Sequence, residues 1–559
     1  MWAWAISEVG NCERITYGND IDSFIAYCSF MHESTSFYFH NLKFDGEFIL
    51  SYLLKNNFKH TKERKLNVGQ FSTLISDMNV FYCIRVKFSE NVNITFYDSL
   101  KLLNFSVAEV AKGFSLPIRK LEIDYKEYRE PGHELTKQEK DYISNDVKIM
   151  AMALAKMFEM NLTRMTIGSN ALHIFKETIG KKKFEKWFKT PTYDKDIRQS
   201  YKGGFTYLNK RYRGIEVGEG IVLDVNSLYP SVMYDKPMPY GEGVYYTGKY
   251  EDDSIYKLYI QNISCQFEVK ENKIPTIQLK NNLSFAPTEY LESSGGEAIN
   301  LTLTNVDLEL FLEHYYVYDL NYNWGWKFKS STKFFKEYID YWNGVKVKAT
   351  LEGNKPMRTI AKLMLNSLSG KFATSPESKS KIPYLENGIV KYKLGELEER
   401  KALYIPVGSF ITSWARNKTI RSAQTVYNRF IYADTDSLHL EGNEYPEGLP
   451  ISDTNLGEWK IESRFKRGRY LRQKSYMEDT YATPEEIEKY LKDKPELSHL
   501  VSSDSILNIV CAGMPKSCYK YVDWDNFNYG SEFQGKLGVK HVDGGIVLVD
   551  TTFTIKELT

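Results

Sequence analysis

Residues 432–437, Tyr-Ala-Asp-Thr-Asp-Ser, place the carboxylates of Asp434 and Asp436 two positions apart. Apolar residues precede and follow this segment, which predicts a strand, a tight turn and a second strand. The turn holds both carboxylates at one tip, where a bound divalent cation relieves their repulsion. Hard oxygen ligands suit Mg²⁺ or Mn²⁺ better than zinc. A solvent-exposed acidic turn is the alternative, so the rest of the chain has to decide.

A third carboxylate follows a buried strand in the middle of the chain. The apolar segment 220–225 ends with Asp224 and Val225. Ser227 then begins a helical turn, and Pro230 suits an early helical position. We therefore expect Asp224 to be presented at the end of a strand.

Cations recur with helical spacing in the segment 342–372. Arg358, Lys362, Asn366 and Gly370 follow one another at intervals of four residues, so in a helix they form one slowly rotating stripe. Cations on such a stripe can hold a triphosphate, and a glycine lets a bulky group approach the backbone. A solvated basic helix face is the alternative, and the Asn–Gly end of the stripe argues against it.

Basic and aromatic residues interleave in the segment 465–476. If this segment is a strand, Arg472, Lys474 and Tyr476 share one face. Such a face can neutralise phosphates with aromatic support. It can also be a solvent-facing edge strand protected by its charges.

The first third of the chain alternates strands and helices, which indicates an α/β layer. Asp45 lies where a strand gives way to a helix, so it can face a cleft or cap the helix as its first residue. Tyr142 and Asp146 lie one turn apart on a helix whose capping box begins at Thr136. They can position a metal-bound water or form a surface pair.

Length and composition allow several domains. The 559 residues carry a net charge of only +1, so no overall basic field points to nucleic acid. The six cysteines form no zinc-binding spacing, and no apolar stretch approaches the length of a membrane span. We expect short strands with a small core of their own between 237 and 340, a β-rich segment at 376–399, a helix at 414–429 and an exposed helix at 485–494.

Four motifs occur in order along the chain. They are Asp-Val-Asn-Ser-Leu-Tyr-Pro at 224–230, Lys-Leu-Met-Leu-Asn-Ser-Leu-Ser-Gly at 362–370, Tyr-Ala-Asp-Thr-Asp-Ser at 432–437 and Lys-Ser-Tyr at 474–476. With them the chain closely resembles the protein-primed family B DNA polymerases of small tailed phages, the phage phi 29 type. The resemblance covers essentially the whole sequence.

The resemblance implies a multidomain α/β and α+β fold. An RNase H-like 3′–5′ exonuclease domain precedes a right-hand polymerase of palm, fingers and thumb, with two insertions that contact the priming protein. The implied ranges are 1–165 for the exonuclease domain, 166–236 and 401–512 for the palm, 237–337 and 374–400 for the insertions, 338–373 for the fingers and 513–559 for the thumb.

The resemblance also implies a role for each matching residue. Asp224 and Asp436 would bridge two catalytic Mg²⁺ ions beside Val225 and Asp434, with Mn²⁺ able to replace Mg²⁺. The residues expected at the nucleotide are Tyr229, Lys346, Arg358, Lys362, Asn366 and Gly370. Compared with the family pattern, the chain has extra residues at 347–357, directly after the position matched by Lys346. Those expected at the DNA are Tyr201, Gly203, Gly204, Lys474 and Tyr476 in the polymerase part, and Asn41, Phe44, Ser99 and Leu100 in the exonuclease part.

Two departures from the family pattern stand out. Ser369 occupies the position where the family normally has a tyrosine beside the nascent base pair. The family's exonuclease also uses an Asp-x-Glu pair ahead of the segment matched by residues 1–6, which leaves Asp45, Lys120, Tyr142 and Asp146 as the matching exonuclease positions. From this we expect weak or absent proofreading, through either a shortened reading frame or a true loss.

The resemblance names partners as well. They are primer–template DNA, deoxynucleotides, a terminal priming protein and a phage single-stranded-DNA-binding protein. The resemblance also implies that the protein is a monomer, acts in the cytoplasm of an infected bacterium and does not contact a membrane. A chain that acts mainly as an exonuclease and a DNA-binding relic without catalysis are the competing hypotheses. The intact Asp224, Asp434 and Asp436 argue against the relic.

Overall fold

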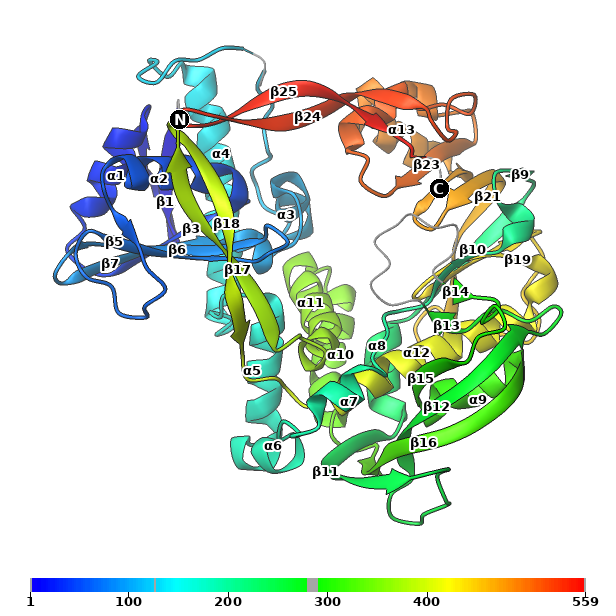
Figure 1. Cartoon of the computed structure of the whole chain (residues 1–559). Helices are drawn as coiled ribbons and strands as arrows, with labels where there is room; N and C mark the ends of the chain where they lie inside the picture. Colours follow the sequence, from blue (N-terminus) through cyan, green and yellow to red (C-terminus); the bar gives the residue numbers. More distant parts are fainter. Residues whose placement is uncertain (1–2, 125–126, 279–289, 557–559) are drawn as a thin grey trace.

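A computed structural model describes residues 3–124, 127–278 and 290–556. Figure 1 shows an N-terminal lobe in blue and cyan and a larger lobe in green, yellow and orange. The two lobes are joined through helices in the middle of the molecule, and a long hairpin near the C-terminus reaches from the larger lobe back to the N-terminal one. The predicted multidomain α/β and α+β organisation is therefore observed.

The N-terminal lobe contains a five-stranded sheet in the order β3-β7-β6-β5-β4, with β1 and β2 paired as a separate hairpin. Phe24, Phe37 and Phe96 form an aromatic core on this sheet, which confirms the predicted α/β layer. The elements are β1 (Trp4–Glu8), β2 (Asn11–Gly18), α1 (Ile21–Ser29), β3 (Thr35–Phe39), α2 (Leu42–Lys55), β4 (Lys59–His60), β5 (Gln70–Ile75), β6 (Phe81–Ser89), β7 (Val92–Asp98), α3 (Val107–Gly113) and α4 (Lys137–Glu159).

A layer of helices connects the lobes. Phe175 of α5 stacks on Phe335 at 4.8 Å between ring centroids and also meets Phe372 of α11, so α5 packs along the paired helices α10 and α11. These helices are α5 (Ile167–Ile179), α6 (Lys181–Trp187), α7 (Asp194–Arg198), α10 (Lys336–Leu351) and α11 (Lys355–Phe372).

The centre of the larger lobe is an antiparallel sheet in the order β23-β22-β21-β10-β20-β19-β8, with β9 paired to β21. The buried helix α12 packs against α8 and against strands β19 and β20. The elements are β8 (Thr206–Leu208), β9 (Glu216–Val217), β10 (Gly220–Val225), α8 (Leu228–Asp235), α12 (Ile405–Thr425), β19 (Phe430–Asp434), β20 (Ser437–Glu441), β21 (Trp459–Arg472), β22 (Ser475–Tyr481) and β23 (Ser505–Cys511).

The segment expected to be the first insertion, and called so below, contains a four-stranded sheet in the order β11-β16-β12-β15. Its predicted separate core exists around Phe267, Phe311 and Tyr315. The predicted short strands occur as β13 and β14, of two residues each, but β12 has 12 residues and β16 has 17. The elements are β11 (Met238–Thr247), β12 (Leu258–Val269), β13 (Ile277–Gln278), β14 (Tyr290–Leu291), β15 (Ile299–Thr304), α9 (Asn305–His314) and β16 (Tyr315–Ser331).

Two long hairpins and a small C-terminal core complete the chain. The segment predicted to be β-rich forms β17 (Glu377–Glu386) and β18 (Ile389–Glu399), and the C-terminal tail forms β24 (Glu532–Val542) and β25 (Gly545–Thr554). The predicted exposed helix is α13 (Pro484–Asp493), whose residues include none that is buried.

Two boundaries predicted from the sequence were wrong. The helix expected at 414–429 is α12, which begins at Ile405 because the apolar residues 405–411 bury it from its first turn. The strand expected at 465–476 is the hairpin β21–β22, and Lys474 lies in its turn with a φ of 55°. Lys474 therefore does not share a strand face with Arg472 and Tyr476.

All six cysteines are free thiols. No helix among the described residues is long and apolar enough to cross a membrane.

Candidate active site

Three strand ends bring the predicted carboxylates together. Asp224 on β10 lies opposite Ser437 of β20, and Ser437 also pairs with Asp434 of β19 across the tight turn. The backbone N–H of Val225 donates to the carbonyl of Asp436 at 2.8 Å. The predicted strand, turn and strand are confirmed, and Asp224, Asp434 and Asp436 lie at one end of the central sheet.

Mutual repulsion marks this group of carboxylates. Burial raises the pKa of Asp436 to about 6, and the charges of Asp224, Asp434 and Glu462 contribute to the rise. Burial and Glu462 also raise the pKa of Asp224, whereas Lys460, whose Nζ lies 3.4 Å from Asp224 Oδ2, opposes the rise. A cation between these groups would relieve the repulsion.

Lys460 and Glu462 are site residues that sequence reasoning missed. Both lie on β21, where Lys460 is the direct partner of Asp224 in the antiparallel register. Lys460 and Glu462 lie two residues apart, so in a strand they share one face, which was a weak sign of a common role. Only the pairing of β21 with β10 shows that they lie at the end of the sheet that carries the carboxylates.

Lys474 binds the third carboxylate from the turn between β21 and β22. Its Nζ lies 2.7 Å from Asp434 Oδ2, and its backbone N–H donates to the Tyr432 hydroxyl at 3.0 Å. The ring of Tyr476 stacks on Tyr470 at 5.4 Å. Lys474 thus borders the carboxylates from a turn, not from a strand face shared with Tyr476 as predicted.

A cluster of four cations faces the carboxylates. The pKa of Lys346 on α10 is lowered by its burial and by the charges of Arg358, Lys362 and Lys460. Lys362 also lowers the pKa of Asp224, which places its ammonium near the carboxylates. The expected Lys346 therefore lies on α10 beside Arg358 and Lys362 of the α11 stripe, with its Nζ 3.5 Å from Ser227 Oγ.

The remaining positions of the stripe stay open to a ligand. Asn366 and Gly370 are exposed on α11, and a Cβ built on Gly370 meets no atom within 4 Å. Tyr229 lies on α8, where burial raises the pKa of its hydroxyl to about 12. The exposed edge of α11 at Asn366 and Gly370, together with the Tyr229 ring, is therefore open to a ligand beside the carboxylates.

The loop 201–204 lies directly against the catalytic turn. A Cβ on Gly204 would lie 2.6 Å from Thr435 Oγ1 and 3.1 Å from the Tyr229 hydroxyl, so only glycine fits there. The Thr435 backbone N–H donates to the carbonyl of Phe205 at 2.6 Å. The predicted Tyr201, Gly203 and Gly204 are therefore part of the same site.

Arg416 anchors this loop and was not predicted. Its side chain is 3% exposed and donates to the carbonyls of Lys202 and Gly203 at 2.8 and 2.7 Å. It also forms an ion pair with Asp307 of the first insertion at 2.6 Å. A single arginine within a helix gives no sequence signal for these long-range bonds.

The chemistry of the site fits a divalent metal. Within 3–124, 127–278 and 290–556, no three His, Cys, Asp or Glu side chains already form a metal-binding cluster. Asp224 and Asp434 instead bond lysines, which a metal can displace. The donors are hard oxygens, and the neighbouring carboxylates that add to the raised pKa of Asp436 would be neutralised by a cation.

A second acidic group lies in the N-terminal lobe. Lys120 Nζ lies 2.6 Å from Asp146 Oδ2 and 3.2 Å from the Tyr142 hydroxyl. Burial, together with the charge of Asp98, raises the pKa of Asp45 to about 7. Burial lowers the pKa of His40, while the charges of Asp98 and Asp146 oppose this, so these groups lie close together.

The predicted exonuclease positions surround Asp98. Its Oδ1 accepts the backbone N–H groups of Asn41 and Leu100, both at 3.0 Å, and Ser99 follows it in a 3₁₀ turn. Helix α2 begins at Leu42, so Asp45 lies inside its first turn and the helix-cap alternative was wrong. Phe44 is half-buried on the same turn.

Comparisons with known proteins decide the family. A family model described as DNA polymerase type B, organellar and viral, matches residues 26–130 and 121–454. The chain belongs to this family of DNA polymerases. The resemblance stated from the motifs is thereby confirmed, and this protein is a DNA-directed DNA polymerase.

Relatives match the polymerase along its whole length. The DNA polymerase of Bacillus phage M2 is 46% identical over 100% of this chain and 96% of its own, and that of Bacillus phage phi29 is 44% identical with the same coverage. A solved structure of phi29 DNA polymerase with primer–template DNA and incoming nucleotide substrates matches with a TM-score of 0.89 and 42% identity, covering 99% of this chain and 96% of that one.

Proposed function

We propose that this DNA polymerase starts synthesis from a protein hydroxyl and copies a linear phage genome by processive strand displacement, in the cytoplasm of an infected bacterium. The observation that carries the proposal is the meeting of three carboxylates with four cations at one end of the central sheet. The two insertions and the full-length similarity to polymerases of Bacillus phages support the protein-primed subfamily.

Asp224 and Asp436 would hold two Mg²⁺ ions, together with the backbone of Val225, and Mn²⁺ can replace them. When bound, such a metal pair lowers the pKa of the attacking hydroxyl and neutralises the charge of the leaving pyrophosphate. Asp434 keeps Lys474 beside the pair through their 2.7 Å contact. Lys474 can then steady the primer end, with Tyr476 packed behind it.

The cation cluster provides a triphosphate site. Lys362, Arg358 and Lys346 converge from two helices, so a triphosphate would be neutralised from several sides at once. Tyr229 would pack under the sugar, where a 2′-hydroxyl meets its ring. Asn366 and Gly370 would line the nascent base pair, because they leave that edge of α11 open.

Primer–template DNA and deoxynucleotides are the proposed partners, as in the phi29 polymerase complex. The loop with Tyr201, Gly203 and Gly204 would guide the template, since it lies against the catalytic turn. A terminal priming protein would contact the two insertions, and a phage single-stranded-DNA-binding protein would cover displaced DNA. We propose that the polymerase works as a monomer.

Primer extension tests the catalytic assignment. A 5′-labelled primer on a longer template is incubated with Mg²⁺ and deoxynucleotides, using the wild type, Asp436→Asn and the control Asp252→Asn, which removes an exposed acid of the first insertion. We expect extension by the wild type and the control, and a loss of at least about 10³-fold in Asp436→Asn because a metal ligand is missing. Extension by Asp436→Asn at the wild-type rate would overturn the assignment.

Priming is tested separately with a purified terminal protein and one labelled deoxynucleotide. Covalent labelling of the terminal protein is expected only with the intact polymerase site. Extension of DNA primers without any labelling of the protein would reject protein priming and leave the polymerase assignment intact.

We further propose that Asp45 and Asp146 are metal ligands of a 3′–5′ exonuclease site, with Lys120 and Tyr142 as neighbours. The contacts of Lys120 with Asp146 and Tyr142 support this second activity. Without deoxynucleotides, any shortening of the primer should disappear in Asp146→Ala. Shortening that persists in this variant would contradict the assignment.

A further inference from the structure

The segment from α5 to the start of α7 carries an unusual local charge. Between residues 176 and 189 there are six lysines and two glutamates, a net charge of +4 in a chain whose total is +1. Lys181 pairs with Glu177 at 3.0 Å. Lys182, Lys183, Lys186 and Lys189 are exposed, and none of them lies within ion-pairing distance of a carboxylate of the described part of the chain.

The helix spacing aligns these free lysines. Lys182 and Lys186 lie one turn apart on α6 and therefore share one face, with Lys183 beside it, and Lys189 follows two residues after the end of the helix. Phe184 and Phe188 are buried on the opposite side, where they pack on Phe372 of α11. The buried aromatic side fixes the orientation of α6, so the lysine face points to solvent.

Two further cations lie beside the aromatic side of α6. Lys176 of α5 lies over the Phe184 ring, 4.5 Å from its centroid. Its pKa is lowered by partial burial and by the positive charge of Lys401, which follows the second insertion. The fold thus holds Lys176 near Lys401, and the charge of Glu185 on α6 offsets part of their repulsion.

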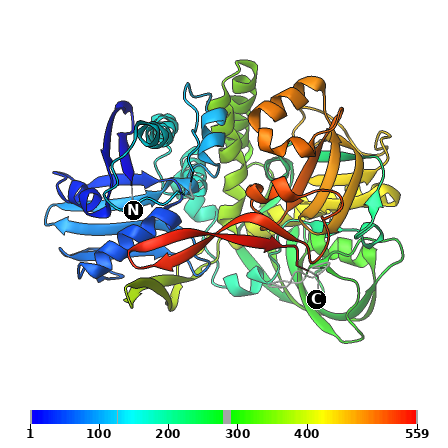
Figure 2. The ribbon, with the colours of Figure 1, turned by 90° about the horizontal axis from the view of Figure 1, so that it is seen from above.

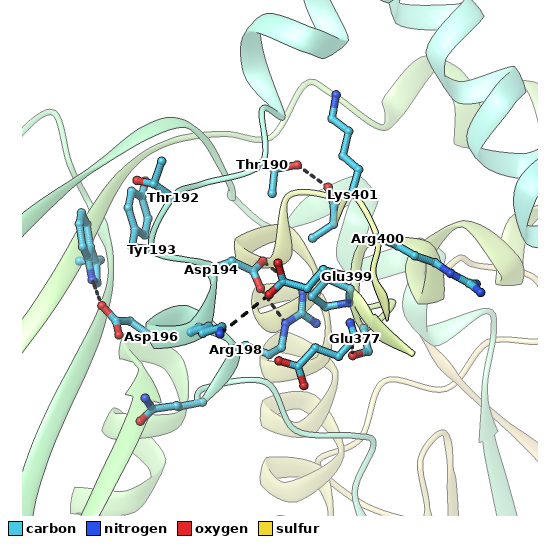
Figure 3. A pocket seen from close by; sticks show the side chains of 16 residues that line it. Thr190, Thr192, Tyr193, Asp194, Asp196, Arg198, Glu377, Glu399, Arg400 and Lys401 are labelled. Carbon is cyan, nitrogen blue, oxygen red and sulfur yellow. Dashed lines mark hydrogen bonds and ion pairs between the residues drawn. The ribbon is translucent and has the colours of Figure 1, made fainter. Parts of the chain in front are cut away.

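In the described part of the chain, the acidic side chains of the neighbouring cavity do not pair with these lysines. The cavity has a volume of about 760 Å³ and lies between α7, the first insertion and the base of the second. Its charges are largely satisfied by contacts such as Arg198–Asp194 at 2.8 Å and Lys195–Glu399 at 4.0 Å. Figure 3 shows Lys401 extending away from the other side chains that line the cavity.

The position of α5 relates the lysine face to the path of DNA. A Cβ built on Gly168, near the start of α5, would lie 3.0 Å from the Lys371 side chain and 3.4 Å from the Ser367 carbonyl of α11. This end of α5 is therefore next to the stripe that faces the nucleotide, whereas its other end leads into α6. Helix α5 therefore connects the surroundings of this stripe to α6, which carries the lysine face.

We propose that Lys176, Lys182, Lys183, Lys186, Lys189 and Lys401 form a binding surface for the phosphate backbone of single-stranded DNA outside the polymerase site. The strand is either the unpaired template ahead of the site or the displaced strand, which have the same chemistry. Lysines at this spacing act as point charges on phosphates and read no sequence. The inference rests on the proposed function as a strand-displacing polymerase.

The test compares the triple variant Lys182→Ala/Lys183→Ala/Lys186→Ala with the wild type. Lys59→Ala/Lys65→Ala/Lys257→Ala serves as the control, because it removes the same charge from exposed lysines elsewhere. Binding is measured against salt for three substrates: a primer–template with a short overhang, one with a template overhang of ~16 nucleotides, and one with a displaced flap of the same length.

We expect the wild type and the control to bind one of the long substrates more tightly than the short one. The triple variant should lose this difference, with a salt slope reduced by about 2, since each lysine–phosphate contact on a single strand contributes about 0.7. The substrate that shows the loss identifies the strand. Equal binding and equal salt slopes for the wild type and the triple variant on both long substrates would overturn the inference.

Extension of the short-overhang primer separates this inference from the proposed function. The triple variant should extend that primer at the wild-type rate, which also shows that it is folded. A wild type that fails to extend the primer would reject the proposed function, whereas unchanged binding by an active triple variant rejects the DNA-binding surface alone.

Discussion

Protons and metal ions compete for Asp436. Burial among other carboxylates raises the pKa of Asp436 to about 6, well above its ordinary value of 3.8. It is therefore negatively charged above that pH and becomes neutral as the pH falls through it. A metal bound there favours the charged form, so affinity for the metal and ionisation of Asp436 are linked.

We predict that the apparent affinity of the polymerase for Mg²⁺ falls as the pH is lowered from neutral to below about 6. The measurement is a Mg²⁺ titration of primer extension at a series of pH values. In Asp434→Asn, which removes one of the repelling charges, the decline should begin at lower pH. A Mg²⁺ midpoint that does not change across this range would contradict the prediction.

Ser369 lies beside the open edge of α11, one residue before Gly370. Its hydroxyl donates to the carbonyl of Asn366 at 3.3 Å, so the side chain turns back on its own helix. We predict that Ser369→Tyr lowers KM for deoxynucleotides about fivefold, since an aromatic ring stacked on a base is worth at least ~1 kcal/mol.

Single-nucleotide insertion kinetics would measure the effect of Ser369→Tyr. Ser369→Phe is the control that separates stacking of the ring from any contact of the hydroxyl, and both variants should behave alike if stacking is the cause. An unchanged KM in both would show that this position does not touch the nucleotide.

At the scale of elements, helix α12 ties the first insertion to the catalytic turn. Arg416 bonds Asp307 of α9 and the carbonyls of residues 202 and 203, and Thr419 of the same helix donates to the carbonyl of Thr435 at 2.7 Å. One helix face thus holds both the loop that would guide the template and the turn that carries the carboxylates.

We predict that Arg416→Ala lowers the free energy of unfolding by about 3 kcal/mol, because it removes the buried partner of the half-buried Asp307 and leaves that carboxylate, among the described residues, only its bonds from Thr304 and Ser413. The double variant Arg416→Ala/Asp307→Ala should cost less than the sum of the two single variants. Denaturant unfolding of the four proteins measures this coupling. Additive losses would contradict a direct interaction between the two side chains.

The elements also show what the sequence could predict. The chain order of strands and the carboxylates at their ends followed from local patterns, as did the stripe on α11 and the capping box of α4. The partners Lys460, Glu462 and Arg416 could not be predicted, because they depend on which strands pair and on contacts across 100 or more residues. The turn at Lys474 was missed because its residues carry no glycine or proline signal.

At the scale of the whole molecule, the C-terminal hairpin links the two lobes. Figures 1 and 2 show β24 and β25 crossing from the larger lobe to the N-terminal one. Asp543 at the tip forms an ion pair with Lys55 of α2, and a Cβ on Gly545 would lie only 2.4 Å from the Phe48 ring. The hairpin, α2 and the second insertion therefore meet at one junction.

Glu47 is the buried centre of this junction. It is 3% exposed, accepts a hydrogen bond from the Tyr392 hydroxyl of β18 at 2.8 Å, and its other oxygen lies 3.8 Å from His541 Nδ1 of β24. Because the three side chains come from the N-terminal lobe, the second insertion and the C-terminal hairpin, their contacts close a ring of protein. A closed ring keeps DNA from leaving sideways during synthesis, which is how the fold would support processivity.

We therefore predict that Tyr392→Phe shortens the products of single-encounter synthesis on a long primed template by about fivefold or more. The variant leaves Glu47 without its hydrogen-bond donor, which costs about 1–3 kcal/mol at a buried group and favours opening of the junction. Tyr384→Phe is the matched control, because it removes a hydroxyl from the same hairpin at a position without a bond to Glu47. Addition of the first nucleotide should be unchanged in both variants, since the contact joins α2 and β18 rather than the strands that carry the carboxylates. If Tyr392→Phe makes products as long as the control does, this junction does not hold the ring closed.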